Sequence, residues 1–286
     1  MNLCGVSVSA LSPPESERYA RDHEPTPEPI PEPIDDKAMS KPRNPIVLIP
    51  ARLASTRLPD KPLAPIAGAP MIVQVWRRAR EADVGPVVVA CAEQAIFEAV
   101  RDAGGEAVLT EPDLPSGSDR IFEALSKIDG EGHFDAVINL QGDLPTIDAE
   151  TVRAVLDPLD DPACDIATLV AQITEAAELD DPNVVKAVLG LTAGQTTGRA
   201  LYFSRAAVPV GDGPLYHHIG IYAYRRLALE RFVTMAPGVL EQRERLEQLR
   251  ALENGLSIHA ALVDTVPLGV DTPADLERAR EMLGAL

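Results

Sequence analysis

From residue 45 onward, short apolar runs alternate with longer segments in which apolar residues recur every three or four positions. The runs predict buried strands at 46–49, 87–91, 107–109 and 136–140. The segments between them predict amphipathic helices at 71–80, 95–103 and 118–127. Strands that alternate with helices form a parallel sheet covered on both faces, so this half of the chain predicts an α/β fold.

The second half of the chain has a more mixed pattern. Further strands are predicted at 166–170, 200–203, 218–224 and 258–263. One long helix is predicted over 240–253, because its leucines share a face and Gly255 follows as a stop signal. A final helix is predicted to begin at Thr272 and Pro273, a cap residue followed by a favoured first-turn residue.

The first 44 residues differ from the rest in composition. They repeat Pro-Glu units between Pro25 and Pro33, carry few large apolar residues and show no period. This composition is typical of an extended, solvated segment. We therefore predict a disordered Pro/Glu-rich N-terminal extension over residues 1–44 and one folded domain over residues 45–286.

The sequence predicts a cytoplasmic protein. No run approaches 18 consecutive apolar residues, and the N-terminus lacks the basic region, apolar stretch and cleavage site of a signal peptide. The three cysteines, Cys4, Cys91 and Cys164, are far apart and lack CxxC spacing, as expected in a reducing compartment.

Net charge limits the choice of partner. The 286 residues carry a formal charge of -18 at pH 7, and this field repels nucleic acid backbones and anionic membrane surfaces. We therefore predict neither a nucleic-acid partner nor a membrane partner. A polyphosphate ligand would need local cations or a divalent metal ion to offset the field.

A basic loop follows the first predicted strand. Arg52, Arg57 and Lys61 lie within ten residues, beside the hydroxyls of Ser55 and Thr56. Such groups bind phosphate oxygens, so the loop is a candidate phosphate site, and the alternative is a solvated basic loop. The Walker GxxxxGK motif and the GxGxxG turn are both absent, which weakens ATPase and dehydrogenase interpretations.

Two aspartates are candidate metal ligands. Asp143 follows the strand at 136–140, and Asp271 precedes the C-terminal helix. Ligands of open parallel sheets bind beyond the carboxyl ends of the strands, and two carboxylates there can share one Mg²⁺. The alternative for Asp143 is a turn residue, and the alternative for Asp271 is a helix cap.

Three weaker signals complete the candidates. The segment from Ser116 to Arg120 opens a predicted helix and either binds an anion or supplies an N-cap. His217 and His218 lie in a predicted strand, where a polar ring in the core is the alternative to a ligand. Glu247 and Gln248 lie on the predicted long helix, where simple exposure to solvent is the alternative to function.

Eight segments together resemble the 3-deoxy-manno-octulosonate cytidylyltransferases, also called CMP-Kdo synthetases. They are IPARLASTRLPDKPL at 49–63, PMIVQVWRRA at 70–79, SGSDRI at 116–121, NLQGDLP at 139–145, ALYFSRAAVP at 200–209, HHIGIYAYR at 217–225, LEQLRALENG at 246–255 and GVDTPADLERAR at 269–280. The resemblance covers nearly all of the predicted folded domain.

The resemblance implies a nucleotide-diphospho-sugar transferase fold, which is Rossmann-like with a mostly parallel sheet and a smaller, partly antiparallel segment that forms a homodimer. It implies that the chain joins CTP to 3-deoxy-manno-octulosonate (Kdo) for lipopolysaccharide synthesis, releases pyrophosphate and requires Mg²⁺. In this reaction the anomeric 2-hydroxyl of the sugar attacks the α-phosphorus of CTP.

The resemblance also assigns roles to residues. It assigns catalysis to Arg52, Lys61, Asp143 and Asp271, and Mg²⁺ binding to the two aspartates. It assigns CTP contacts to Ala51, Arg52, Ser55, Lys61 and Gln141. It assigns sugar contacts to Arg57, Arg120, His218, Tyr222, Glu247 and Gln248.

Three positions depart from the family pattern. Asp60 stands where Gly is frequent, Leu144 stands where Glu is frequent, and the second strand ends in Ala92-Glu93 rather than in Thr-Asp. Two alternatives therefore stay open. One is a cytidylyltransferase for another keto-acid sugar, such as 8-amino-Kdo or a sialic-acid-like sugar, and the other is a non-catalytic nucleotide or sugar binder on the same fold.

Overall fold

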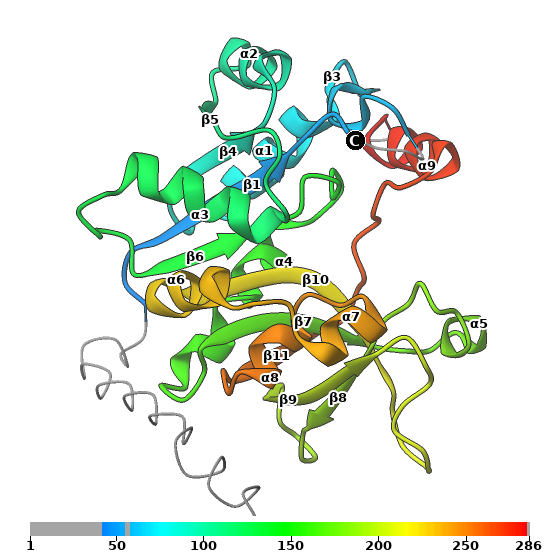
Figure 1. Cartoon of the computed structure of the whole chain (residues 1–286). Coiled ribbons are helices and arrows are strands. Elements are labelled where there is room, and N and C mark those ends of the chain that lie inside the picture. Colours follow the sequence, from blue (N-terminus) through cyan, green and yellow to red (C-terminus); the bar gives the residue numbers. More distant parts are fainter. Residues whose placement is uncertain (1–41, 55–57, 285–286) are drawn as a thin grey trace, which may run out of the picture. The chain divides into compact units, whose positions relative to one another are not determined.

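The computed structural model describes residues 42–54 and 58–284. Most of the predicted N-terminal extension lies outside the described residues, as do Ser55 and Arg57 of the basic loop. Figure 1 shows the order and arrangement of the helices and strands. Within the described ranges, no helix is long and apolar enough to cross a membrane.

One mixed sheet carries the fold, with strands in the order β5-β4-β1-β6-β10-β7-β11-β9-β8. The bounds of its strands are β1 Pro45–Ala51, β4 Val87–Cys91, β5 Glu106–Leu109, β6 Ala136–Asn139, β7 Ile166–Gln172, β8 Lys186–Gly190, β9 Thr197–Ser204, β10 Tyr216–Arg225 and β11 Ile258–Val263. A separate hairpin is formed by β2 Pro65–Ile66 and β3 Ala69–Pro70. Every strand predicted from the apolar pattern is confirmed, whereas β8 and the hairpin have no counterpart in that pattern.

The helices connect and cover these strands. Their bounds are α1 Met71–Glu81, α2 Gln94–Asp102, α3 Gly117–Ile128, α4 Ala149–Ala154, α5 Ala176–Leu179, α6 Arg226–Thr234, α7 Val239–Glu244, α8 Leu249–Glu253 and α9 Pro273–Gly284. The predicted helices at 71–80, 95–103 and 118–127 are confirmed as α1, α2 and α3 within one residue at each end. The predicted start of the last helix at Pro273 is confirmed by α9.

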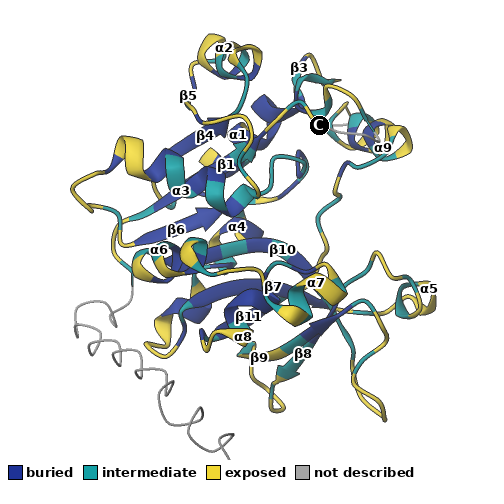
Figure 2. Cartoon of the chain, viewed as in Figure 1, coloured by how far each residue is buried: buried dark blue, intermediate teal, exposed yellow. Residues whose placement is uncertain are grey.

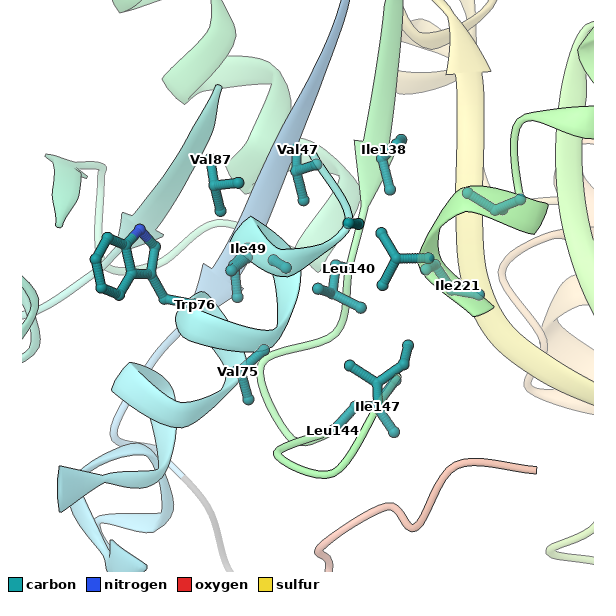
Figure 3. Packing of buried hydrophobic residues seen from close by; sticks show 14 of the residues in the cluster. Val47, Ile49, Val75, Trp76, Val87, Ile138, Leu140, Leu144, Ile147 and Ile221 are labelled. Carbon is teal, nitrogen blue, oxygen red and sulfur yellow. The ribbon is translucent and has the colours of Figure 1, made fainter. Parts of the chain in front are cut away.

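The strands β5, β4, β1 and β6 are all parallel. β1 is apolar on both sides because Val47 and Ile49 face one core while Ile46 and Leu48 face the other. Figure 3 shows the first core, in which α1 packs Trp76 beside β1 and β4. The second core lies against α3 and α6, and Figure 2 shows buried strands between helices that expose one side.

The expectation of a mostly parallel sheet holds only for this half. β10 runs antiparallel to both β6 and β7, and β9 runs antiparallel to β11 and β8. Only β7 and β11 form a parallel pair in the other half of the described sheet. The position of β10 next to β6 brings residues from the second half of the chain beside the parallel strands.

The prediction of one helix over 240–253 is wrong, because α7 and α8 are separate helices. Arg245 ends α7 in a left-handed conformation, with φ 56° and ψ 47°. A tertiary contact explains the break. The Glu244 carboxylate accepts hydrogen bonds from Ser204 Oγ (2.9 Å) and Arg205 N (3.0 Å), so the end of α7 is bonded to the end of β9.

The turns before β4 and β5 each contain a glycine with positive φ, and the two glycines differ in the space available for a side chain. Gly85 has φ +154°, and a Cβ there would overlap the carbonyl of Pro45, whereas Gly104 has φ +80° with open space around it. We expect Gly85→Ala to lower the free energy of unfolding by more than about 2 kcal/mol, because strain and overlap add. Gly104→Ala should cost about 1 kcal/mol from strain alone. Urea denaturation measures both, and equal losses would contradict this account.

Candidate functional site

A cleft of about 450 Å³ opens at the carboxyl ends of β1 and β6. Its walls come from the loops after these strands, the start of α3 and the segment before α9. The predicted site residues that line it are Ala51, Arg52, Lys61, Arg120, Gln141, Asp143 and Asp271. This is the edge at which open parallel sheets bind their ligands.

Lys61 lies at the centre of the charged part of the cleft. Its Nζ donates to Asp143 Oδ2 (2.9 Å), to Asp271 Oδ1 (3.1 Å) and to the carbonyl of Val270 (2.9 Å). Burial alone would lower the pKa of Lys61, but the two carboxylates outweigh burial and raise it above its ordinary value. Lys61 is therefore a charged ammonium that holds both aspartates.

Backbone pairing and a small core bring the two aspartates together. Val270 N donates to Asp143 O at 2.9 Å, which joins the segment before α9 to the loop after β6. Val270 is fully buried with Met71 of α1 and Leu276 of α9. These contacts fix Asp271 opposite Asp143, although the two residues are far apart in the sequence.

The residue that caps α9 is Thr272, not Asp271. Thr272 Oγ1 accepts a hydrogen bond from Asp275 N (3.2 Å), and the Asp275 carboxylate accepts one from Thr272 N (2.9 Å). This reciprocal pair is a capping box at the start of α9. Thr272 is thus the N-cap, and the Asp271 carboxylate contacts Lys61.

Two small residues shape the cleft wall. Ser116 is the N-cap of α3, because its Oγ accepts from Asp119 N at 3.2 Å, which confirms the capping alternative for this segment. At Gly142, a Cβ would lie 2.8 Å from Pro50 O. The loop that carries Asp143 therefore approaches β1 this closely only because residue 142 has no side chain.

Arg120 lines the cleft, but its guanidinium is largely bonded to the chain. The residue is 2% exposed, and it donates to the carbonyls of Glu111 (2.9 Å) and Pro112 (3.1 Å) and to Thr110 Oγ1. Burial lowers the pKa of Arg120, although the nearby Glu93 carboxylate opposes this shift. Arg120 therefore fixes the 110–112 segment at the rim of the cleft.

Four predicted sugar contacts, His218, Tyr222, Glu247 and Gln248, are not among the described residues that line the cleft. They form a second group that adjoins it through α3, because Ser118 Oγ donates to Glu247 Oε2 at 3.0 Å. The break between α7 and α8 turns this segment inward, so Gln248 is only 7% exposed and the solvent-exposed alternative is wrong for it.

Two polar atoms of this second group are unsatisfied. Glu247 Oε1 and Gln248 Nε2 are buried and have no hydrogen-bond partner within the described residues, although the Arg250 guanidinium lies 3.8 Å from Glu247 Oε1. Buried side-chain polar atoms in native proteins nearly always have partners. An acceptor and a donor on these two consecutive residues fit a ligand that is rich in hydroxyl groups.

His218 is a buried ring in the core strand β10. Its Nε2 lies 3.0 Å from Thr168 Oγ1, and its ring centroid lies 4.8 Å from that of Phe203 and 5.6 Å from that of Tyr222. Burial, with a smaller effect of His217, lowers the pKa of His218 to about 3. The ring is therefore neutral near pH 7 and supports Tyr222 by packing.

The sequence did not single out Tyr224 and Asn139, which link the cleft to the second group. The Tyr224 hydroxyl lies close to the side chains of Ser118 and Asn139, and Gln141 Nε2 donates to Asn139 Oδ1 at 3.5 Å. Burial raises the pKa of Tyr224, so its hydroxyl stays protonated. The sequence points to these two residues only through their place in the segments that resemble the family.

The three departures from the family pattern have structural explanations. Asp60 has φ 53°, in the left-handed region where glycine is favoured and aspartate is tolerated. Leu144 is 8% exposed and packs in the core with Ile147. Glu93 Oε2 accepts from Leu53 N at 3.0 Å, so this carboxylate fixes the start of the basic loop.

Cations and a pair of carboxylates at the carboxyl edge of the parallel strands, with Asp271 brought there by the segment before α9, are typical of a nucleotidyltransferase site, and comparisons agree. A family model described as Cytidylyltransferase matches residues 46–258. Two proteins called 3-deoxy-manno-octulosonate cytidylyltransferase, from Paramagnetospirillum magneticum and Rhodospirillum rubrum, are each 65% identical over 241 residues. Both alignments cover 84% of this chain, with 98% and 96% of the respective relatives.

A solved structure gives the same result. It is that of CMP:2-keto-3-deoxy-manno-octonic acid synthetase complexed with CTP, with 40% identity and a TM-score of 0.78 over 85% of this chain and 99% of that one. The chain belongs to the 3-deoxy-manno-octulosonate cytidylyltransferase family, as its motifs predicted.

The buried His218 makes stability depend on pH. Its folded pKa of about 3 lies below the ordinary value of 6.5, so the unfolded chain binds more protons and stability is lost as pH falls below about 6.5. We expect this group to cost about 1.4 kcal/mol per pH unit between pH 6 and 4. Urea denaturation of His218→Gln should show a shallower pH slope than the unaltered protein. Equal slopes would contradict a neutral His218.

Proposed function

We propose that the chain transfers CMP from CTP to the anomeric hydroxyl of Kdo and releases pyrophosphate. The hydroxyl oxygen forms a bond to the α-phosphorus, the bond from that phosphorus to the bridging oxygen breaks, and pyrophosphate leaves with the electron pair while the hydroxyl proton is released. The observation that best supports this proposal is the cluster of Lys61, Asp143 and Asp271 at the cleft. The chain is also 65% identical to a protein named for this activity.

The nucleotide is proposed to lie along the β1 and β6 loops. Arg52 and Lys61 would stabilise the charge that builds up on the departing pyrophosphate. Ala51 and Gln141 line the same cleft and would contact CTP. Ser55, the remaining proposed CTP contact, lies outside the described residues.

The donor set suits Mg²⁺. Asp143 and Asp271 supply two hard oxygen ligands, and Mg²⁺ in such sites takes its other ligands from water and substrate phosphates. No group of three His, Cys, Asp or Glu that could hold a metal ion is found in the described ranges. When bound, Mg²⁺ would neutralise phosphate charge and lower the pKa of the attacking hydroxyl.

Lys61 is proposed to exchange partners during binding. In the free protein its ammonium holds both carboxylates, at 2.9 and 3.1 Å. A triphosphate in the cleft offers denser negative charge to the same ammonium. Movement of Lys61 toward the phosphates would release Asp143 and Asp271 to act as ligands.

The sugar is proposed to lie between the cleft and the second group. Glu247 Oε1 would accept a hydrogen bond from one sugar hydroxyl, and Gln248 Nε2 would donate one to another. Tyr222 would contact the sugar, supported by the buried His218. Arg120 would act through the rim segment, and Arg57, also proposed for the sugar, lies outside the described residues.

The wider setting is proposed from the same resemblance. The functional domain would span residues 45–286, consistent with a family match that begins at residue 46. The protein would act in the cytoplasm as a homodimer in lipopolysaccharide synthesis. Exposed apolar side chains in the second half, such as Leu201 (56%) and Val239 (71%), offer surface for a partner subunit.

The reaction is tested by pyrophosphate release. The purified protein should release pyrophosphate with CTP, Kdo and Mg²⁺, and not when sugar or metal is omitted or when ATP or UTP replaces CTP. Release only with 8-amino-Kdo or a sialic acid would assign the alternative sugar class. No release by folded protein with any of these sugars would contradict the proposed function.

The two aspartates are tested in the same assay. We expect Asp143→Asn and Asp271→Asn each to lower turnover by about 100-fold or more, because each removes one of the two carboxylates proposed to hold Mg²⁺ beside the reacting phosphate. Thermal stability should change little by comparison. Asp102→Asn on the exposed side of α2 is the matched control. Loss of stability without selective loss of turnover would return Asp271 to a structural role.

The exchange by Lys61 is tested by metal binding without turnover. Lys61→Met removes the cation that competes for both carboxylates, so we expect the free protein to bind Mn²⁺ about tenfold more tightly, or about 1.4 kcal/mol. Electron paramagnetic resonance of free Mn²⁺ measures this. Lys127→Met, which removes a surface lysine paired with Glu123, is the control. Unchanged or weaker Mn²⁺ binding would contradict the exchange.

A further inference from the structure

A second hollow, of about 400 Å³, lies at the amino ends of β4 and β5, the edge of the parallel strands opposite to the cleft. It is formed by the end of α1 and by the turns that lead into these two strands. None of the residues assigned to CTP, Kdo or metal lines it among the described residues. The proposed function therefore leaves this hollow without a role.

Trp76 lines this hollow and carries an unsatisfied donor. The residue is 5% exposed, yet its Nε1 has no hydrogen-bond partner within the described residues. Figure 3 shows the indole at the margin of the core with its nitrogen on the side of Val87, which also lines the hollow. A buried indole N–H usually has a partner, so a ligand oxygen in the hollow would satisfy it.

Arg80 places a cation beside this donor. Its guanidinium carbon lies 5.0 Å from the centre of the Trp76 ring, and the guanidinium makes no hydrogen bond or ion pair within 42–54 and 58–284. Stacking on the indole holds the charge at the hollow. An indole N–H and a guanidinium together suit a carboxylate or phosphate oxygen.

Two carboxylates at the rim narrow the choice of ligand. Asp83 and Glu106 line the same hollow and are exposed. They repel a multiply charged phosphate more strongly than a single carboxylate, and they accept hydrogen bonds from hydroxyl groups. We propose that the hollow binds a small monocarboxylate that carries hydroxyl groups, with its carboxylate on Trp76 and Arg80 and its hydroxyls toward Asp83 and Glu106.

The test uses the fact that Trp76 is the single tryptophan of the chain. Titration with D-gluconate should change Trp76 fluorescence in a saturable way, and saturating CTP should not shift the midpoint because the cleft is separate. Arg80→Gln keeps the reporter and should weaken binding at least tenfold. Arg78→Gln, which removes a neighbouring arginine paired with Glu81, should bind as the unaltered protein does.

Other ligands and a second method complete the test. D-glucose and inorganic phosphate should each bind more weakly than gluconate, since one lacks the carboxylate and the other lacks the hydroxyl arrangement. Calorimetry of folded Trp76→Phe should show loss of gluconate binding. An absent fluorescence change, an unaltered midpoint in Arg80→Gln, or tighter binding of phosphate would overturn the proposal.

Discussion

The ammonium of Lys61 joins three parts of the chain that are distant in sequence. It is bonded to Asp143 after β6, and to Asp271 and the Val270 carbonyl before α9. Two carboxylates facing each other at a half-buried site would repel, and the lysine between them removes that repulsion. The ammonium of Lys61 therefore balances the charge at the point where these three parts of the chain meet.

The surrounding structure is arranged to keep that cluster in place. The hydrogen bond from Val270 N to Asp143 O fixes the backbone on both sides of the ion pairs. Burial of Val270 with Met71 and Leu276 secures α9 against α1. An apolar core thus determines the separation of charged groups, because the side chains of Asp143 and Asp271 follow wherever their backbones are packed.

Much of this was predictable from the sequence, and the failures have a common cause. Buried strands such as β1 and β4 stand out because both faces are apolar, and the cap at Thr272 is a local signal. The rule that parallel strands end at one edge predicted the place of Asp143, whereas the place of Asp271, which lies in the segment before α9 rather than at a strand end, rested on the family resemblance. Local pattern and topology were sufficient for all of these features except the place of Asp271.

Tertiary contacts account for the rest. The break between α7 and α8 depends on Ser204 and Arg205 binding Glu244, which helical periodicity does not encode. β10 runs antiparallel to β6 and β7, and its sequence does not predict this direction because an apolar run can form a parallel or an antiparallel strand. From the sequence, the guanidinium of Arg120 was expected to bind a ligand, but in the fold it donates to the carbonyls of Glu111 and Pro112.

The insertion of β10 between β6 and β7 explains how one sheet carries two kinds of binding group. Parallel strands place cations and carboxylates at a shared edge, where we propose that a triphosphate binds. An antiparallel strand beside β6 instead presents aromatic and hydroxyl groups along its length, such as Tyr222 and Tyr224. Tyr224 then meets Ser118 of α3, whose first turn already forms the cleft wall. The charged groups of the cleft and the hydroxyl-bearing groups of β10 therefore meet at α3, and a nucleotide and a sugar acid bound as proposed would come together there.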